Sequence, residues 1–198
     1  IIINPNSVRA SGSKMVGGLA GEIDGAYMYN ITVDNNDLLV LGRNAVGGVA
    51  GIIKGAFEII GINSNASAFS AYTYNVGQQY NLYVGGNVNK GFADNIEYVS
   101  YSGSIAGIVD GYNFANPSMS VRQLSNYFTI KDIELTGSLV LIGETVGGAF
   151  GLVGERTLVE NISYNIDSAT LYQGKYFSGG LVGENRGAII NANISLVN

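Results

Sequence analysis

Short apolar segments alternate with turn-forming residues along the whole chain. The first unit has three such segments, at residues 16–20, 26–33 and 38–41. Segments of about 4–8 residues bounded by Gly, Asn and Asp are the expected pattern of β-strands. Apolar and polar side chains alternate within 26–33 and 130–136, as in strands with one buried face. No segment has the pattern of a capped amphipathic helix, so the sequence predicts an all-β chain.

A glycine-rich repeat of about ten residues returns five times, which indicates a stacked array rather than an ordinary globule. The copies are Val16-Gly-Gly-Leu-Ala-Gly-Glu-Ile-Asp-Gly25, Val46-Gly-Gly-Val-Ala-Gly-Ile-Ile-Lys-Gly55, Ser102-Gly-Ser-Ile-Ala-Gly-Ile-Val-Asp-Gly111, Val146-Gly-Gly-Ala-Phe-Gly-Leu-Val-Gly154 and Ser178-Gly-Gly-Leu-Val-Gly-Glu-Asn-Arg-Gly187. Their first glycines are Gly17, Gly47, Gly103, Gly147 and Gly179, so the steps are 30, 56, 44 and 32 residues. The step of 56 suggests a divergent copy near Val84-Gly-Gly86. The step of 44 suggests one unit that carries an insertion.

A unit of this size cannot bury its own apolar face and must stack on a neighbouring unit. We therefore expect a β-solenoid of the right-handed parallel β-helix type, with about six coils and repeats of roughly 30 residues. Residues 1–198 are expected to form a single repeat domain, a fragment of a longer array, with insertions near 57–84 and 112–128. An antiparallel sandwich or barrel is the main alternative, because it also has many short strands and Gly-rich turns.

Glycine in a strand costs roughly 0.5–1 kcal/mol relative to alanine, so the repeated glycines must answer a geometric demand. We expect tight corners with positive φ and close approach of backbones where coils stack.

Charge and composition exclude several classes of function. The net charge is −5 and the ten Lys and Arg residues are scattered, whereas nucleic-acid binding requires a basic patch. The apolar residues are dispersed in segments too short for a membrane span of about 20 residues. The chain has no Cys and no His, so thiolate chemistry, the usual neutral-pH base and the usual zinc ligands are missing.

Carboxylates provide the remaining candidates for chemistry. The closest groupings are Glu22/Asp24, Asp34/Asp37, Asp94/Glu97 and Asp132/Glu134. Glycoside hydrolysis needs two converging carboxylates, but a solvated outer face explains these groupings better. The Asp34-Asn-Asn-Asp37 cluster offers oxygen ligands for calcium but lacks a specific calcium motif, and a plain turn is favoured. We expect no cofactor, with calcium left open, and no catalytic residue.

Aromatic residues between the glycine-rich repeats are candidates for a weak ligand-binding surface. The chain has 13 Tyr and 7 Phe, and Tyr provides large, rigid, amphipathic contacts. The candidates are Tyr72, Tyr74, Tyr80, Tyr83, Tyr98, Tyr101 and Tyr112. The alternative is that these rings only stack from coil to coil.

Asparagine recurs at a fixed distance from the glycine-rich repeat. Asn30, Asn161 and Asn193 lie 13 or 14 residues after the first glycine, each followed by Ile and then Thr or Ser. These are glycosylation sequons, as is Asn65, but their number is close to that expected by chance. The recurring position predicts an Asn ladder or a turn, in which side-chain amides satisfy backbone groups of adjacent coils.

The glycine-rich repeats resemble the GLUG motif, named after its Gly-Leu-hydrophobic-Gly core. The last copy, Gly179-Gly-Leu-Val-Gly-Glu-Asn-Arg-Gly187, is the most similar, whereas Ile23, Ile53 and Val109 replace the usual Asn of the motif. In that family such repeats occur in very large secreted bacterial proteins, mainly adhesins of the filamentous-haemagglutinin type. The resemblance implies a secreted, bacterial cell-surface location.

The sequence and the resemblance together predict a non-catalytic, rod-like adhesin segment. Its partners would be a glycan or protein receptor on a host or neighbouring cell, and neighbouring repeats of the same chain. Two alternatives remain open: a polysaccharide-active β-helix enzyme or its ancillary domain, and a self-assembling structural repeat element. Without an initiating Met or a signal peptide, the chain is expected to be a piece of a longer protein.

Overall fold

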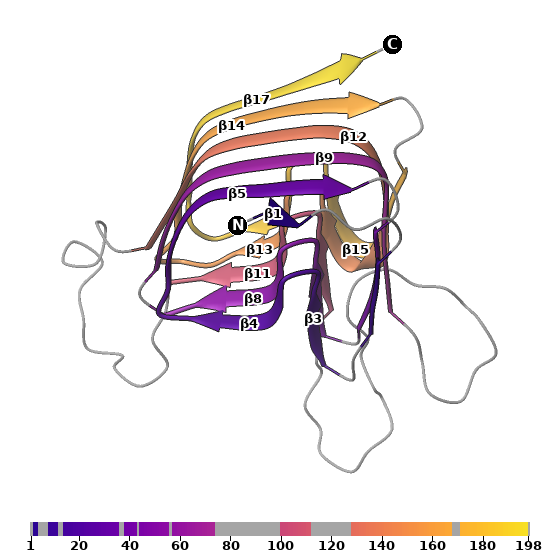
Figure 1. Cartoon of the computed structure of the whole chain (residues 1–198), viewed down its shortest axis with the longest axis horizontal. Coiled ribbons are helices and arrows are strands. Elements are labelled where there is room, and N and C mark those ends of the chain that lie inside the picture. Colours follow the sequence, from indigo (N-terminus) through magenta and orange to yellow (C-terminus); the bar gives the residue numbers. More distant parts are fainter. Residues whose placement is uncertain are drawn as a thin grey trace.

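The computed structural model describes residues 2–3, 8–11, 14–35, 38–42, 44–55, 57–73, 100–111, 128–167 and 171–197. These ranges contain β-strands and no helix, as the sequence predicted (Figure 1). Every pairing between the described strands is parallel. Parallel pairing throughout contradicts the alternative of an antiparallel sandwich or barrel.

The first half of each glycine-rich repeat forms a short strand in a twelve-stranded sheet. These strands are β3 (Met15–Gly17), β7 (Ala45–Gly47), β10 (Tyr101–Gly103), the end of β12 (Phe128–Gly147) and the end of β15 (Leu171–Gly179). The five first glycines are register partners from strand to strand. The sequence repeat is therefore a structural repeat.

The second half of each glycine-rich repeat forms a strand of a separate five-stranded sheet. Its members, in spatial order, are β4 (Ala20–Asp24), β8 (Ala50–Lys54), β11 (Ala106–Asp110), β13 (Phe150–Val153) and β16 (Val182–Asn185). One glycine-rich repeat thus supplies two strands and the corner between them, whereas the sequence pattern had suggested a single apolar segment there.

Longer strands complete each circuit of the chain and stack in sequence order (Figure 1). They are β5 (Tyr27–Asn35), β9 (Phe57–Thr73), the start of β12, β14 (Leu158–Asp167) and β17 (Ala188–Val197). Strands β1 (Ile2–Ile3) and β2 (Val8–Ser11) pair with β5 and β6 (Leu38–Gly42), respectively. Strand β6 pairs with the end of β9, and β15 pairs with β12.

Two sequence-based expectations about the circuits need correction. Gly47 and Gly103 are direct register partners, so the 56 residues between them make one circuit and not two. The predicted divergent copy is therefore wrong. Among the described residues, five strands stack at the glycine-rich repeat, and β1 adds a sixth strand to the stack of long strands. Residues 57–73, assigned to an insertion, form the regular strand β9. Residues 74–84 and most of 112–128 lie outside the described residues.

Close backbone contact explains most of the repeated glycines. A Cβ atom added to Gly51 would lie 2.5 Å from the amide nitrogen of Val16, and one added to Gly107 would lie 2.5 Å from that of Val46. At this position the second strand of one copy is thus too close to the first strand of the preceding copy for any side chain. Positive φ occurs instead at Gly25 and Gly55, which end the first two copies. Both predicted reasons for glycine apply, at different positions of the same repeat.

The core lies inside the circuits and consists of columns of similar side chains. One column contains Ile31, Ile62, Ile133 and Ile162, which are register partners and almost fully buried. The rings of Phe57 and Phe128, also partners, have centroids 5.9 Å apart. Each circuit therefore covers the apolar face of the previous one, as a stacked array requires. Among the described residues, no helix is long and apolar enough to cross a membrane.

Candidate ligand-binding surface

A column of left-handed residues interrupts the long strands. The residues at this position, all with φ between 52° and 77°, are Asn30, Gly61, Asp132, Asn161 and Asn191. Their neighbours on both sides are register partners, so the column runs across five strands. Only Gly, Asn and Asp adopt this conformation readily, which accounts for the residue types found there.

Side-chain amides connect this column from strand to strand. Asn161 Nδ2 donates to Asp132 Oδ1 at 2.9 Å, and Asn191 Nδ2 donates to Asn161 Oδ1 at 3.0 Å. The sequence predicted an Asn ladder or a turn, and of the three predicted residues Asn161 takes part in these bonds. Asn30 lies at a left-handed position of the same column, beside Gly61, which has no side chain. The prediction wrongly included Asn193, which pairs with Ser163; the ladder position is Asn191. The error arises because four residues separate β13 from β14 but only two separate β16 from β17.

The left-handed residue also shifts the alternation of inward and outward side chains. In β12, Ile130 and Ile133 are both buried although they are three positions apart, and Lys131 and Asp132 lie between them. In β5, Tyr29 and Asn30 are exposed and Ile31 is buried. The outer face of the long strands therefore carries two consecutive side chains at each ladder position.

Of the seven tyrosines predicted to bind a ligand, only Tyr101 has a described side chain. It is partly buried in β10, and burial raises its pKa, with a further contribution from the Glu184 carboxylate. Tyr72 lies in β9 as the partner of Leu41, and its side chain is outside the description. Tyr74, Tyr80, Tyr83, Tyr98 and Tyr112 lie outside the described residues.

The exposed aromatic side chains of the described residues lie on the strands themselves. Their exposed fractions are 59% for Tyr27, 50% for Tyr29, 53% for Tyr176 and 53% for Phe177. The sequence analysis selected tyrosines of two less regular stretches, 72–83 and 98–112, and therefore missed these four residues, which lie in the strands β5 and β15. A signal was present: Tyr27 and Tyr29 occupy alternate positions of an amphipathic segment, on the side opposite to Met28.

Tyr27 and Tyr29 form the first aromatic pair, beside Glu58 of the next circuit. The Tyr29 hydroxyl donates a hydrogen bond to Glu58 Oε2 at 2.9 Å, and Tyr27 is the register partner of Glu58. The hydrogen bond to this carboxylate raises the pKa of Tyr29, because it stabilises the protonated phenol. The carboxylate thus fixes one ring while the faces of both rings remain accessible.

Tyr176 and Phe177 form the second aromatic pair, at a bulge of β15. The register with β12 shifts between Gly143 and Thr145, so that Lys175 and Tyr176 both lie opposite Glu144. Lys175 Nζ lies 4.6 Å from the centroid of the Tyr176 ring. The interaction with the Tyr176 side chain, and secondarily with the carboxylate of Glu144, raises the pKa of Lys175.

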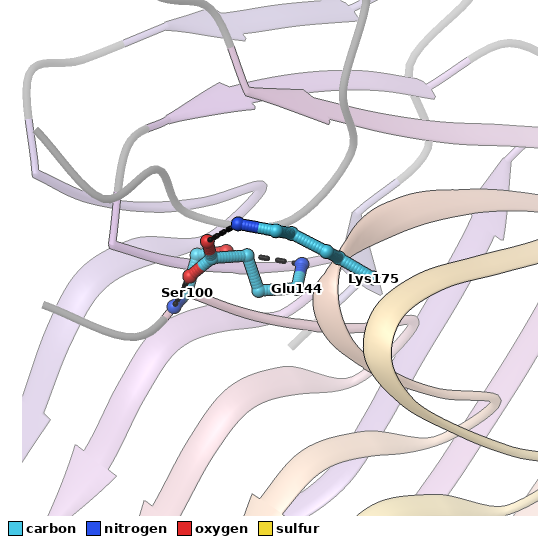
Figure 2. Close-up of polar contacts among 3 residues, drawn as sticks. All are labelled: Ser100, Glu144 and Lys175. Atoms are coloured by element: carbon cyan, nitrogen blue, oxygen red, sulfur yellow. Dashed lines mark hydrogen bonds and ion pairs between the residues drawn. The ribbon is translucent and has the colours of Figure 1, made fainter. Parts of the chain in front are cut away.

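Glu144 anchors this bulge to the preceding circuit (Figure 2). Its Oε2 accepts the Ser100 backbone N–H at 3.2 Å, and its own N–H donates to the Ser100 hydroxyl at 3.1 Å. Lys175 Nζ reaches the other carboxylate oxygen at 3.5 Å. Glu144 is largely buried and each of its carboxylate oxygens has one of these partners, so its arrangement is that of a structural clamp between three circuits.

Of the predicted carboxylate groupings, Glu22/Asp24 and Asp132/Glu134 lie in described strands. Lys54 lies 2.9 Å from Glu22 and 3.6 Å from Asp24, which pairs these charges across circuits. Asp132 and Glu134 are both exposed, and Asp132 belongs to the amide ladder. The described residues contain no group of three or more acidic side chains that could hold a metal ion. The side chains of Asp34–Asp37 and the pair Asp94/Glu97 lie outside the description.

Comparison with known protein families, with curated proteins and with solved structures finds no match to this chain.

Proposed function

We propose that this chain is a β-solenoid segment of a secreted bacterial cell-surface adhesin, with a structural role and an aromatic surface that binds a receptor. The observation that carries the proposal is the exposure of paired aromatic rings on strands whose register is fixed from circuit to circuit. A stack of this kind holds its surface side chains at constant spacing. Repeated weak contacts along such an array would add through effective concentration.

Two features support a non-catalytic role. Glu22 and Asp24 are paired with Lys54, Asp132 is bonded in the amide ladder and Glu144 is held in its clamp, and the chain contains no His. The exposed aromatic side chains, in contrast, are placed where a binding partner can reach them. The GLUG-like motif supports the surface location, because it is the motif that large secreted adhesins carry.

Adhesion is tested directly with the purified 198-residue chain. Beads coated with the chain should adhere to cultured epithelial or bacterial cells, and free chain should compete for the same sites. Albumin-coated beads are the control. Adhesion no greater than that of albumin would contradict the proposal. Release of reducing sugars from pectin or alginate by the chain would instead favour the polysaccharide-active enzyme.

A self-assembling repeat element is a second candidate, favoured by the side chains of β17. Ile194 is 44% exposed, whereas its register partner Tyr164 in the same column is 1% exposed. The edge of this strand therefore presents core-type side chains that another strand could cover. Growth of filaments with concentration, followed by light scattering, would support this candidate; a concentration-independent monomer would exclude it.

A further inference from the structure

The outer face of β5 combines two exposed rings with one fixed acceptor. Tyr27 and Tyr29 are two positions apart on one strand, so their side chains leave the same face about 6.6 Å apart along it. Both rings are at least half exposed. The next strand, β9, places the carboxylate of Glu58 beside them.

Glu58 restricts the Tyr29 ring and keeps acceptor capacity of its own. The Tyr29 hydroxyl donates to Oε2 at 2.9 Å, which ties the ring to the neighbouring circuit. A carboxylate offers about four lone-pair sites, and this bond uses one of them. The site therefore presents ring faces together with an acceptor that can receive hydroxyl donors.

These groups match the chemistry of a sugar. The face of an aromatic ring is negative, so it attracts the partly positive C–H groups on the face of a pyranose. The carboxylate accepts hydrogen bonds from sugar hydroxyls, and such charge-assisted bonds are the stronger ones. Two rings also cover far less than the roughly 800 Å² that each partner contributes to a stable protein interface, whereas they suit one or two sugar units.

We propose that Tyr27, Tyr29 and Glu58 form a binding site for a neutral glycan chain, in which the rings stack on sugar faces and Glu58 accepts a hydroxyl. The negative charge of Glu58 disfavours uronate, sialate and sulfate groups, and this sets the neutral class. The inference rests on the proposed adhesive function and specifies the ligand of its aromatic surface.

The test is binding of the purified chain to an array of neutral polysaccharides (β-glucan, mannan, xylan and galactan) and acidic ones (alginate, heparin and polysialic acid). Wild type should bind at least one neutral polysaccharide. The double variant Tyr27→Ala/Tyr29→Ala should bind it about tenfold more weakly, because aromatic anchors carry most of the energy of such contacts. The control, Leu19→Ala, changes an exposed apolar side chain outside both aromatic pairs and should bind like wild type. Circular dichroism should show that both variants remain folded.

The variant Glu58→Gln keeps an acceptor oxygen but removes the charge, so it should weaken neutral binding several-fold and relax the exclusion of acidic glycans. Binding to acidic polysaccharides alone, no binding to any polysaccharide, or equal binding by the Tyr27/Tyr29 variant would each overturn the inference. The bead assay separates it from the proposed function. If beads coated with the double variant adhere as well as wild-type beads, the adhesive function is retained but this glycan site is rejected. If wild-type beads do not adhere, both the adhesive function and the glycan site are rejected.

Discussion

The glycine-rich repeats and the long strands keep the same circuit-to-circuit register by opposite means. In the repeats, columns of glycine allow two backbones to approach so closely that a single added Cβ would collide with them. In the long strands, side chains at the left-handed positions bond along the stack. Register can therefore be maintained either by leaving no room for a side chain or, among Asp132, Asn161 and Asn191, by side-chain hydrogen bonds between adjacent strands.

The largest effect is expected where a glycine column is broken. Gly107→Ala places a Cβ 2.5 Å from the amide nitrogen of Val46, so the two strands must separate. The free energy of unfolding should fall by about 3 kcal/mol, the upper range for overpacking. Urea denaturation followed by circular dichroism measures it.

Gly180→Ala is the matched control within the same kind of repeat, because an added Cβ there meets only Ile194 Cδ1, at 3.6 Å. It should leave stability nearly unchanged. If both variants lose the same free energy of unfolding, close backbone contact does not explain why glycine is needed at these positions.

The amide ladder should be weaker than the glycine columns. Asn161→Ala loses two ladder bonds and places alanine in the left-handed region, which costs about 1–2 kcal/mol in conformation alone. We expect a loss of about 2 kcal/mol in the same denaturation experiment.

Asn161→Gly separates the two causes, because glycine already occupies this position as Gly61. It removes the amide but keeps the backbone conformation, so less than half of the alanine effect should remain. If glycine and alanine are equally harmful, the ladder bonds are the main contribution and the conformational argument fails.

The Glu144 clamp should contribute less to stability than the amide ladder, mainly through the hydrogen bond that Glu144 accepts from the Ser100 backbone N–H. Glu144→Ala leaves the buried Ser100 N–H without its acceptor and should cost about 1 kcal/mol. Lys175→Met removes an ion pair whose lysine side chain is more than half exposed, and should cost roughly half of that or less. A larger loss for Lys175→Met than for Glu144→Ala would reverse this assignment.

The smallest effect is a shift in a titration. The bond to Glu58 raises the pKa of Tyr29, so its contribution to stability is present at neutral pH and is lost as pH rises through the folded-state pKa. NMR with ring-labelled tyrosine should show Tyr29 ionising later than in Glu58→Gln, with Tyr29→Phe identifying the signal. An unchanged Tyr29 pKa in Glu58→Gln would mean that the hydrogen bond does not form in solution.

The sequence was sufficient to predict the features that recur at the same position in every copy of the repeat. The first glycines of the five copies could be aligned by inspection, and they are register partners in the fold. A corner was expected at the repeated glycines, but the division of each copy into two strands of different sheets was missed, because the apolar run continues through the corner. The second circuit was misjudged because length alone cannot distinguish an insertion from an additional strand.

The candidate site was harder to predict for a related reason. The left-handed residue changes which positions face outward, so counting in twos from the start of a strand fails beyond Asn30 or Asp132. The ladder residue of the last circuit, Asn191, was missed because the preceding turn is two residues shorter than the one before Asn161. Local spacing along the chain therefore predicts the strands better than it predicts which side chains meet.

Parallel, in-register stacking of the circuits can be measured directly by disulfide trapping, because the chain has no cysteine of its own. Glu134 and Ser163 are register partners on adjacent strands, which lie about 4.8 Å apart, within the range that a disulfide spans. The double variant Glu134→Cys/Ser163→Cys should form this bond almost completely under mild oxidation, as mapped by mass spectrometry. Glu134→Cys/Tyr164→Cys, shifted by one residue to the buried face, should not. Efficient bonding in the shifted pair, or none in the register pair, would contradict the stack.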